Sequence, residues 1–569
     1  SSDISVPIKI NDESGILFSA STGNSDTYRQ RSDFESENFL IRYNTKNENY
    51  DFHIDVNNNS YEQLLPGARY IANLNGSTPS DTVTCNLLSD SRTAFQKGTW
   101  YLQPGECLIR DPDYAKFDIN TVTAGTNVQV DGSTNIFMSV ANRDKEQKAF
   151  VAGGASTVGN STSSDIFNFY KLETDYLSLR TDHKTFLGDK LTLLSIGFDL
   201  QNTDYTKKSS QNPSLAFGGF VYASQESRAI FSQNTINLND GNSILSFGAR
   251  LENADYKVRE LFDNSVSKFA FSSERNPYQT KMANHAINIG IEHILNNQNR
   301  IFAKYAEAFR TPDLDSRNQT CVSSYNYPCS DPAFFLKDQI TDEIEFGIRH
   351  NQNNLSLNAS IFEMNTLNEI RYLPEKNNTN LDPIKRRGLN LDINYSLNTK
   401  TNISGSFSYI DAYFTSGSLT RGAFEGTYAA NSQTALNKMD TSRNLSDGTY
   451  SIAGLKVPLV SEYVYNVGLD YLMPQDILFK INMSFADDMF VSNDQENIEP
   501  TIPSYYLFDL SLSGDDEYGM WSFGIDNIFN TSYYNYAVAS SSHVDSSYGR
   551  ENMYPMERRS VFFNYSYEF

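Results

Sequence analysis

The feature that most constrains this chain is a strict alternation of apolar and polar residues, repeated in segments of about ten residues. The clearest case is the stretch 477–485, where five apolar side chains fall on one face of an extended strand: Ile477, Phe479, Ile481, Met483 and Phe485. Similar stretches occur at 343–349, 355–361 and 389–397. A period of two does not fit an amphipathic helix, so it predicts strands with one apolar and one polar face.

The length and number of these segments indicate a barrel. About twenty of them follow one another, and many carry aromatic residues near their ends, as the girdles of a transmembrane barrel require. A soluble β-sandwich shows the same alternation without such girdles. Connections alternate between short, as at 351–353, and long, as at 57–117 and 415–457. We therefore predict an all-β chain, a large antiparallel transmembrane β-barrel of about 20–22 strands with short periplasmic turns and long extracellular loops.

Composition excludes several other classes of protein. The mean hydropathy is -0.49, and no stretch approaches the roughly 18 consecutive apolar residues of a membrane-spanning helix. Aromatic residues make up 13% of the chain, which is too many for a disordered protein. The formal net charge is -23, so we expect no nucleic-acid partner, because nucleic-acid binding needs a basic surface.

The four cysteines form two local pairs in segments that we assign to long extracellular loops: Cys85 with Cys107, and Cys321 with Cys329. Neither spacing fits a metal site. An even number of cysteines in local pairs favours two disulfides formed in an oxidising compartment, and four unrelated reduced thiols remain the alternative. Disulfides of this kind would order the loops or protect them from proteolysis.

The chain ends in a further alternating segment, 561–569, whose last residue is Phe569. A terminal strand that ends in phenylalanine resembles the assembly signal of bacterial outer-membrane barrels. The resemblance implies the barrel-assembly machinery as a partner, whereas an ordinary buried last strand would need no such partner.

Several short motifs resemble those of one family. Residues 526–533, DNIFNTSY, are similar to the penultimate-strand motif N-L-F-N-x-x-Y of TonB-dependent outer-membrane receptors. The words RGL at 387–389, GLKVP at 454–458 and IPSY at 502–505 resemble recurrent words of the same barrels, and YPMERR at 554–559 precedes the final strand as in that family. Together and in order, they give a resemblance over most of the chain.

Two further matches resemble the ferric-citrate-receptor branch. One is FRTPDLD at 309–315, followed by FLK at 335–337 and TDEIEFG at 341–347. The other is LPGA at 65–68 followed by DPDYA at 111–115, although the segment between them is longer than in the family. The FRTP word also resembles the start of a haem-receptor signature, but its Asn-Pro-Asn-Leu partner is absent, which disfavours haem.

The resemblance implies a TonB box and a globular plug, and nothing before Ser14 could hold either. We therefore take 1–13 as a lead-in and 14–569 as the barrel, with the plug supplied by a separate polypeptide or missing. Counting back from Phe569 gives about twenty strands against about 22 in such receptors, so the chain would begin two strands inside the usual barrel. A short strand missed near 8–10 is the alternative.

The resemblance implies a receptor that takes up a ferric chelate, of siderophore or citrate type, across the outer membrane of a Gram-negative bacterium. Such ligands are often anionic and planar, so arginines and aromatics at the extracellular mouth are the candidate contacts. Each could equally be a surface or girdle residue. These candidates are Arg69, Tyr70, Arg110, Arg310, Arg317, Tyr325, Tyr327, Arg371 and Tyr372.

No arrangement of residues indicates an enzyme, a metal site or a cofactor. The six histidines show no HExxH spacing, and no G-x-S-x-G word occurs. In the family, the TonB–ExbB–ExbD complex acts through the plug, while lipopolysaccharide and outer-membrane lipid surround the barrel. The alternatives are a passive porin-like diffusion channel, constricted by an inward-folded loop, and a structural or adhesive surface scaffold.

Overall fold

The computed structural model describes most of the chain, and β-strands dominate it. No helix in this part of the chain is long and apolar enough to cross a membrane. The described residues are 2–25, 33–65, 69–70, 113–151, 166–210, 213, 215–262, 275–314, 336–373, 377–420, 440–446, 449–498, 501–539 and 551–567.

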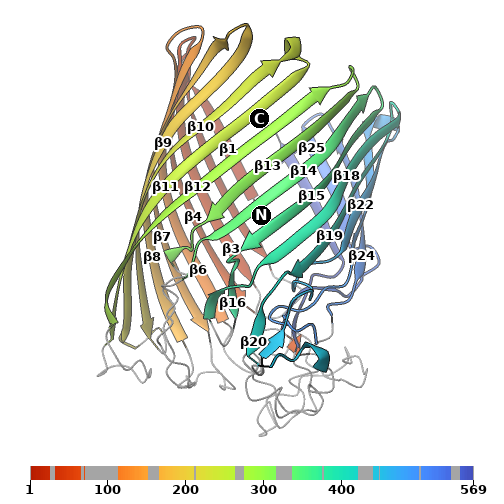
Figure 1. The fold of residues 1–569 in the computed structure, drawn as a ribbon. Helices are drawn as coiled ribbons and strands as arrows, with labels where there is room; N and C mark the ends of the chain where they lie inside the picture. The colour runs from red at the N-terminus through yellow and green to blue at the C-terminus, as the bar shows by residue number, and fades with distance from the viewer. Residues whose placement is uncertain are drawn as a thin grey trace.

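In the described part of the chain, twenty-one strands pair with their neighbours in chain order to form one antiparallel sheet, which Figure 1 shows wrapped into a barrel. This architecture confirms the predicted fold class. The strands are β1 (Ser2–Lys9), β2 (Ser14–Ser25), β3 (Phe34–Lys46), β4 (Tyr50–Leu65), β6 (Asp113–Gln129), β7 (Thr134–Val151), β8 (Ile166–Leu187), β9 (Lys190–Ser210), β10 (Gly219–Leu238), β11 (Ser243–Phe262), β12 (Arg275–Ile294), β13 (Asn299–Arg310), β14 (Gln339–Gln352), β15 (Leu355–Leu367), β18 (Ile384–Asn398), β19 (Thr401–Phe414), β22 (Tyr463–Leu472), β23 (Leu478–Ala486), β24 (Tyr505–Asp515), β25 (Gly519–Asp526) and β28 (Ser560–Tyr567).

Seven shorter strands among the described residues lie outside the main sheet and form small sheets of their own. In Figure 1, β16 and β20 lie at the barrel end opposite the tight turns. The short strands are β5 (Arg69–Tyr70), β16 (Ile370–Leu373), β17 (Asn377–Asn380), β20 (Ser418–Thr420), β21 (Thr449–Ser451), β26 (Tyr534–Ala539) and β27 (Glu551–Pro555).

The two faces of each strand differ as the sequence alternation predicts. On β14, Ile344, Phe346 and Ile348 are exposed on the outer wall, where a bilayer would cover them. Glu343 and Glu345 alternate with them and so face the lumen. Outer and inner walls can therefore be assigned by parity, since residues directly opposite in the register share a face.

The sheet begins earlier than the sequence predicted. Residues Ser2–Lys9, within the predicted lead-in 1–13, form β1 and pair with β2 from Ser2↔Thr22 to Lys9↔Gly15. Pro7 lies inside this segment and argues against a central strand, because proline lacks an amide donor, but edge strands tolerate it. β1 is such an edge: among the described residues it pairs with β2 alone.

Asparagine and aspartate side chains shape the tight turns. Asn47 accepts hydrogen bonds from the backbone amides of Asn49 and Tyr50, at 2.9 and 3.0 Å. Asp131 accepts one from the amide of Ser133 at 2.7 Å. These side chains replace backbone acceptors in the turn, so a short polar sequence is enough to reverse the chain between two long strands.

The best-packed apolar core lies at the end opposite the tight turns. There the segments after β19 pack against the start of β18 and the end of β19, and Phe414, Tyr450 and Ile452 are fully buried. A second cluster buries Val491 and Ile502 in the connection between β23 and β24. Ordered connections therefore pack over the mouth of the barrel and can hold side chains in fixed positions.

Candidate functional site

A cavity of about 480 Å³ opens at the mouth of the barrel, where β13, β14, β15 and β18 reach the long connections. We call it the arginine cavity. It is lined by Arg310, Gln339, Thr341, Met364, Thr366, Glu369, Ile370, Arg371 and Arg386.

The strand residues of the arginine cavity belong to the inner wall. Arg310 is the last residue of β13 and lies opposite Gln339, the first residue of β14. On the neighbouring strands, Met364 lies opposite Arg386. Arg310 has the parity of Lys304, which pairs with the inward-facing Glu343, so the cavity faces the lumen.

One carboxylate holds two of the three guanidinium groups. The Glu369 side chain lies 2.6 Å from Arg386 and 3.5 Å from Arg371, and it is only 15% exposed. Arg386 also donates to the hydroxyl of Thr366 at 3.2 Å. Arg386 is therefore fixed by two partners, while the longer contact with Glu369 is the one that Arg371 makes to a side chain among the described residues.

The connections that carry Glu369 and Arg371 are tied to the strand ends. Gln339 accepts a hydrogen bond from the backbone amide of Ile370 at 3.4 Å. The Asn380 side chain accepts from the amide of Lys337 at 2.7 Å and donates to the carbonyl of Asn368 at 2.8 Å. This bonding fixes the rim of the cavity before any ligand arrives.

The arginine cavity carries an excess of positive charge. Among the described lining residues, three guanidinium groups face one carboxylate, that of Glu369. Arg310 is exposed and makes no ion pair with any other residue that the structure describes. A planar guanidinium offers paired donors that match carboxylate oxygens, so this arrangement suits an anionic ligand.

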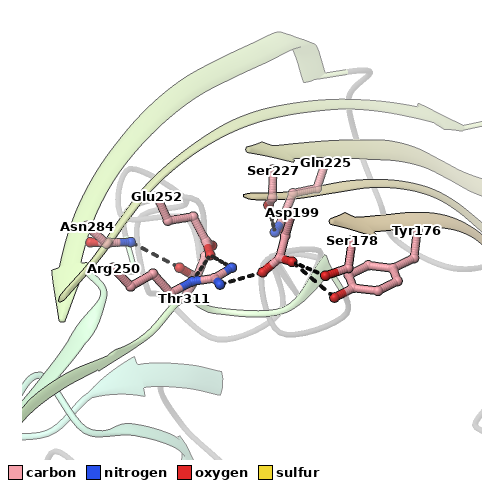
Figure 2. A network of polar contacts seen from close by, with 9 residues as sticks. All are labelled: Tyr176, Ser178, Asp199, Gln225, Ser227, Arg250, Glu252, Asn284 and Thr311. Atoms are coloured by element: carbon pink, nitrogen blue, oxygen red, sulfur yellow. Dashed lines mark hydrogen bonds and ion pairs between the residues drawn. The ribbon is translucent and has the colours of Figure 1, made fainter. Parts of the chain in front are cut away.

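A second polar network on the inner wall has an excess of negative charge instead. Figure 2 shows Arg250 of β11 between two carboxylates, with Asp199 at 2.5 Å and Glu252 at 2.8 Å. Asp199 also accepts hydrogen bonds from Ser178 at 2.8 Å and from Tyr176 at 3.3 Å. Because both carboxylates already bind Arg250, this network offers no cation to an anionic ligand.

The segment after Arg310 bends along the inner wall. Asn284 of β12 donates to the hydroxyl of Thr311 at 3.1 Å, as Figure 2 shows. Leu314 is buried in a cluster with Tyr256 and Val258 of β11. Two contacts, one polar and one apolar, thus anchor the chain directly beyond β13 and restrict where Arg310 can point.

The structure brings together two of the predicted ligand contacts, Arg310 and Arg371. Tyr372 lies in β16, while Arg69 and Tyr70 form β5, which pairs with β27; the side chain of Tyr372 and those of β5 are not among the described ones. The other predicted residues lie outside the described residues and stay predictions: Arg110, Arg317, Tyr325, Tyr327, Cys85, Cys107, Cys321, Cys329 and Phe569.

Neither Arg386 nor Glu369 was predicted from the sequence. Arg386 stands on the polar face of the alternating segment that became β18, directly before the RGL word, and this position was a usable signal. Glu369 gave none, because its role depends on two arginines that the register brings to the same cavity. That these residues line one cavity could therefore be learned only from the structure.

The sequence profile described as "TonB dependent receptor-like, beta-barrel" matches residues 11–528. No curated protein sequence matches the chain.

Solved structures share the fold at low sequence identity. The siderophore receptor PiuA from Acinetobacter baumannii aligns with a TM-score of 0.72 and 13% identity, covering 99% of this chain and 79% of its own. The ferric citrate transporter FecA gives 0.70 and 13%, with coverages of 99% and 74%. The ferric-catecholate import receptor Fiu from E. coli K12 gives 0.68 and 14%, with 99% and 78%.

Proposed function

This chain belongs to the TonB-dependent receptor family, and from that premise we propose that it is the outer-membrane barrel of a receptor for an anionic ferric chelate. Members of the family are transporters of Gram-negative outer membranes, not enzymes. The observation that carries the proposal is the arginine cavity. It lies at the mouth of the barrel, faces the lumen and is lined by Arg310, Arg371 and Arg386. The cavity lies where β13, β14, β15 and β18 reach the long connections, at the end where an external ligand would enter.

The chemistry of the cavity supports a chelate of moderate size with ionised oxygens. Its guanidinium groups suit carboxylate or similar oxygens, while Met364 and Ile370 add apolar lining for the organic part of the ligand. PiuA, FecA and Fiu are a siderophore receptor, a ferric citrate transporter and a ferric-catecholate import receptor, and their fold is shared here. A ferric siderophore or ferric citrate fits both observations.

We further propose that a plug polypeptide occupies the lumen and passes the pull of TonB–ExbB–ExbD to the ligand. At the tight-turn end, Phe186 and Leu191 lie opposite each other on the inner side and are exposed, as is Leu193. In a water-filled channel these apolar side chains would stay wet, whereas a polypeptide in the lumen would cover them. The barrel-assembly machinery and lipopolysaccharide are the further partners of this proposal.

The test is ligand-dependent stabilisation of the protein purified gently from its outer membrane. Thermal unfolding is followed with ferric citrate, a ferric catecholate and a ferric hydroxamate, each against its iron-free chelator. A ligand that binds only the folded state raises the unfolding temperature, and we expect this with an anionic ferric chelate. If no member of the panel shifts the transition, the proposal fails.

A porin-like diffusion channel is the second candidate. The observation that favours it is the inward course of the segment from Thr311 to Leu314, because diffusion channels are narrowed by a loop that folds against the inner wall. Conductance across a planar bilayer separates the two functions. A barrel of this width without a plug conducts strongly, and a plugged receptor hardly conducts.

A further inference from the structure

One part of the inner wall consists of small amide and hydroxyl side chains. We call it the amide–hydroxyl wall and define it by six residues on the inner faces of β15, β18, β19, β22 and β23. They line a cavity of about 330 Å³, in which Asp392 is the one charged lining residue among those described. The six residues are Asn358, Asn394, Ser404, Ser406, Asn466 and Asn482.

The register makes this wall continuous across the strands. Asn358 lies opposite Asp392, Asp392 opposite Ser406, and Ser406 opposite Asn466, so one row crosses four strands. The next row toward the tight turns crosses five strands in the same way, through Ser356, Asn394, Ser404, Gly468 and Asn482. Side chains within the wall already bind one another, as when Asn466 donates to Ser406 at 3.2 Å.

The amide–hydroxyl wall shares β15 and β18 with the arginine cavity and lies farther toward the tight-turn end. Arg386 lines that cavity, and the inward-facing positions that follow it on β18 are Gly388, Asn390, Asp392 and Asn394. At about 3.3 Å per residue, the eight steps from Arg386 to Asn394 cover roughly 26 Å of the wall. On the β18 side, a ligand that leaves the cavity toward the tight-turn end passes Gly388 and Asn390 before it reaches this wall, whereas on the β14 side it meets Glu343, which lies opposite Met364.

The neighbouring inner wall, on β12 to β14, is charged instead. Lys304 lies 3.7 Å from Glu343 and 4.0 Å from Glu345. Glu292 pairs with Arg300 at 3.1 Å and also with Arg349. We call these six residues the charged wall. Its three cations and three anions give a net charge of zero. Each of these side chains can also form a charge-assisted hydrogen bond to a polypeptide in the lumen.

We propose that the amide–hydroxyl wall is the face along which the chelate crosses the lumen, and that the charged wall is where the plug is anchored. This inference rests on the proposed function. Asparagine and serine both donate and accept hydrogen bonds, so they can exchange partners with a hydrated ligand as it moves. Transport needs contacts that are weak enough to release the ligand. None of the six wall residues is a cation, so none of them forms an ion pair with an anionic ligand.

The test compares thiol accessibility on the two walls in intact cells. Ser406→Cys places a thiol on the amide–hydroxyl wall, and Ala306→Cys places one between the charged residues, opposite Glu343. Both side chains are half-buried and lie in the middle of their strands, so they form a matched pair. A small hydrophilic maleimide is applied, and the unsubstituted chain gives the background of the four native cysteines.

We expect the thiol at position 406 to react at least tenfold faster than the thiol at 306, because only the first faces a water-filled path. Equal rates, or a faster reaction at 306, would overturn the inference. Asn466→Cys on β22 and Asn288→Cys on β12, opposite Ala306, repeat the comparison if one variant of the first pair fails to reach the membrane. Labelling needs no chelate, so it fails independently of the stabilisation assay that tests the proposed function.

Discussion

Replacing Glu369 by glutamine is expected to tighten the binding of an anionic chelate. The carboxylate sits within 2.6 Å of Arg386 and 3.5 Å of Arg371, so it neutralises part of the charge that would attract the ligand. Glu369→Gln keeps the size and hydrogen-bonding capacity of the side chain and removes its charge. The substitution therefore raises the positive excess of the arginine cavity from two charges to three.

The magnitude follows from Coulomb's law. For a ligand charge about 7 Å from the Glu369 carboxylate, the repulsion is about 0.6 kcal/mol at the dielectric constant of water and about 2.4 kcal/mol at an effective value of 20. The cavity is half-open, so we take about 1 kcal/mol for each ionised ligand group. Binding should tighten by roughly fivefold per group, and the gain should shrink as salt concentration rises.

The assay is equilibrium titration of the purified protein with ferric citrate at low and at physiological salt. Glu226→Gln is the matched control, because Glu226 pairs with Arg228 at 3.5 Å at an exposed site outside the arginine cavity. The control should bind like the unsubstituted protein. Weaker binding by Glu369→Gln than by that control would show that Glu369 orients the arginines productively and would refute the electrostatic argument.

Other predictions follow from single positions. A Cβ at Gly388 would lie 2.1 Å from the carbonyl oxygen of Tyr409, so Gly388→Ala should lower the unfolding temperature, whereas Gly132→Ala, with open space around it, should not. The backbone amide of Tyr518 donates a hydrogen bond to the Asp516 carboxylate and holds the pKa of that carboxyl below its usual range. The ionised carboxylate therefore stabilises the fold above about pH 4, and this stabilisation is lost as pH falls through the lowered pKa. Asp516→Asn should remove this part of the acid sensitivity in thermal unfolding between about pH 5 and 2, and an unchanged profile would contradict it. Alkylation without reductant followed by intact-mass analysis should find none of the four cysteines modified, and any adduct would contradict the predicted disulfides.

Much of the fold could be predicted from the sequence, because a barrel repeats one local rule. The alternation at 477–485 predicted the two faces of β23, and every strand of the sheet pairs with its neighbour in the chain. β1 was missed because Pro7 and its short length weaken the same signal. Local periodicity therefore sufficed wherever a strand had a continuous apolar face.

The candidate site was predicted only in part, because it depends on contacts between distant segments. Arg310 could be proposed from its position at the end of an alternating segment. Its partnership with Arg371 and Arg386 follows from the pairing of four strands and from the connection that carries Glu369. No local pattern specifies how such a connection folds, since loop residues are the least constrained by the barrel.

The most direct test of the account is the affinity of an anionic ferric chelate for the protein with and without its cavity arginines. Ferric citrate is titrated into the unsubstituted protein, into the double variant Arg310→Ala/Arg371→Ala, and into Arg228→Ala, whose guanidinium is exposed outside the arginine cavity. We predict at least a tenfold loss of affinity in the double variant, about 1.4 kcal/mol, and none in the control. Equal affinity of all three proteins would contradict the assignment of the arginine cavity as the binding site.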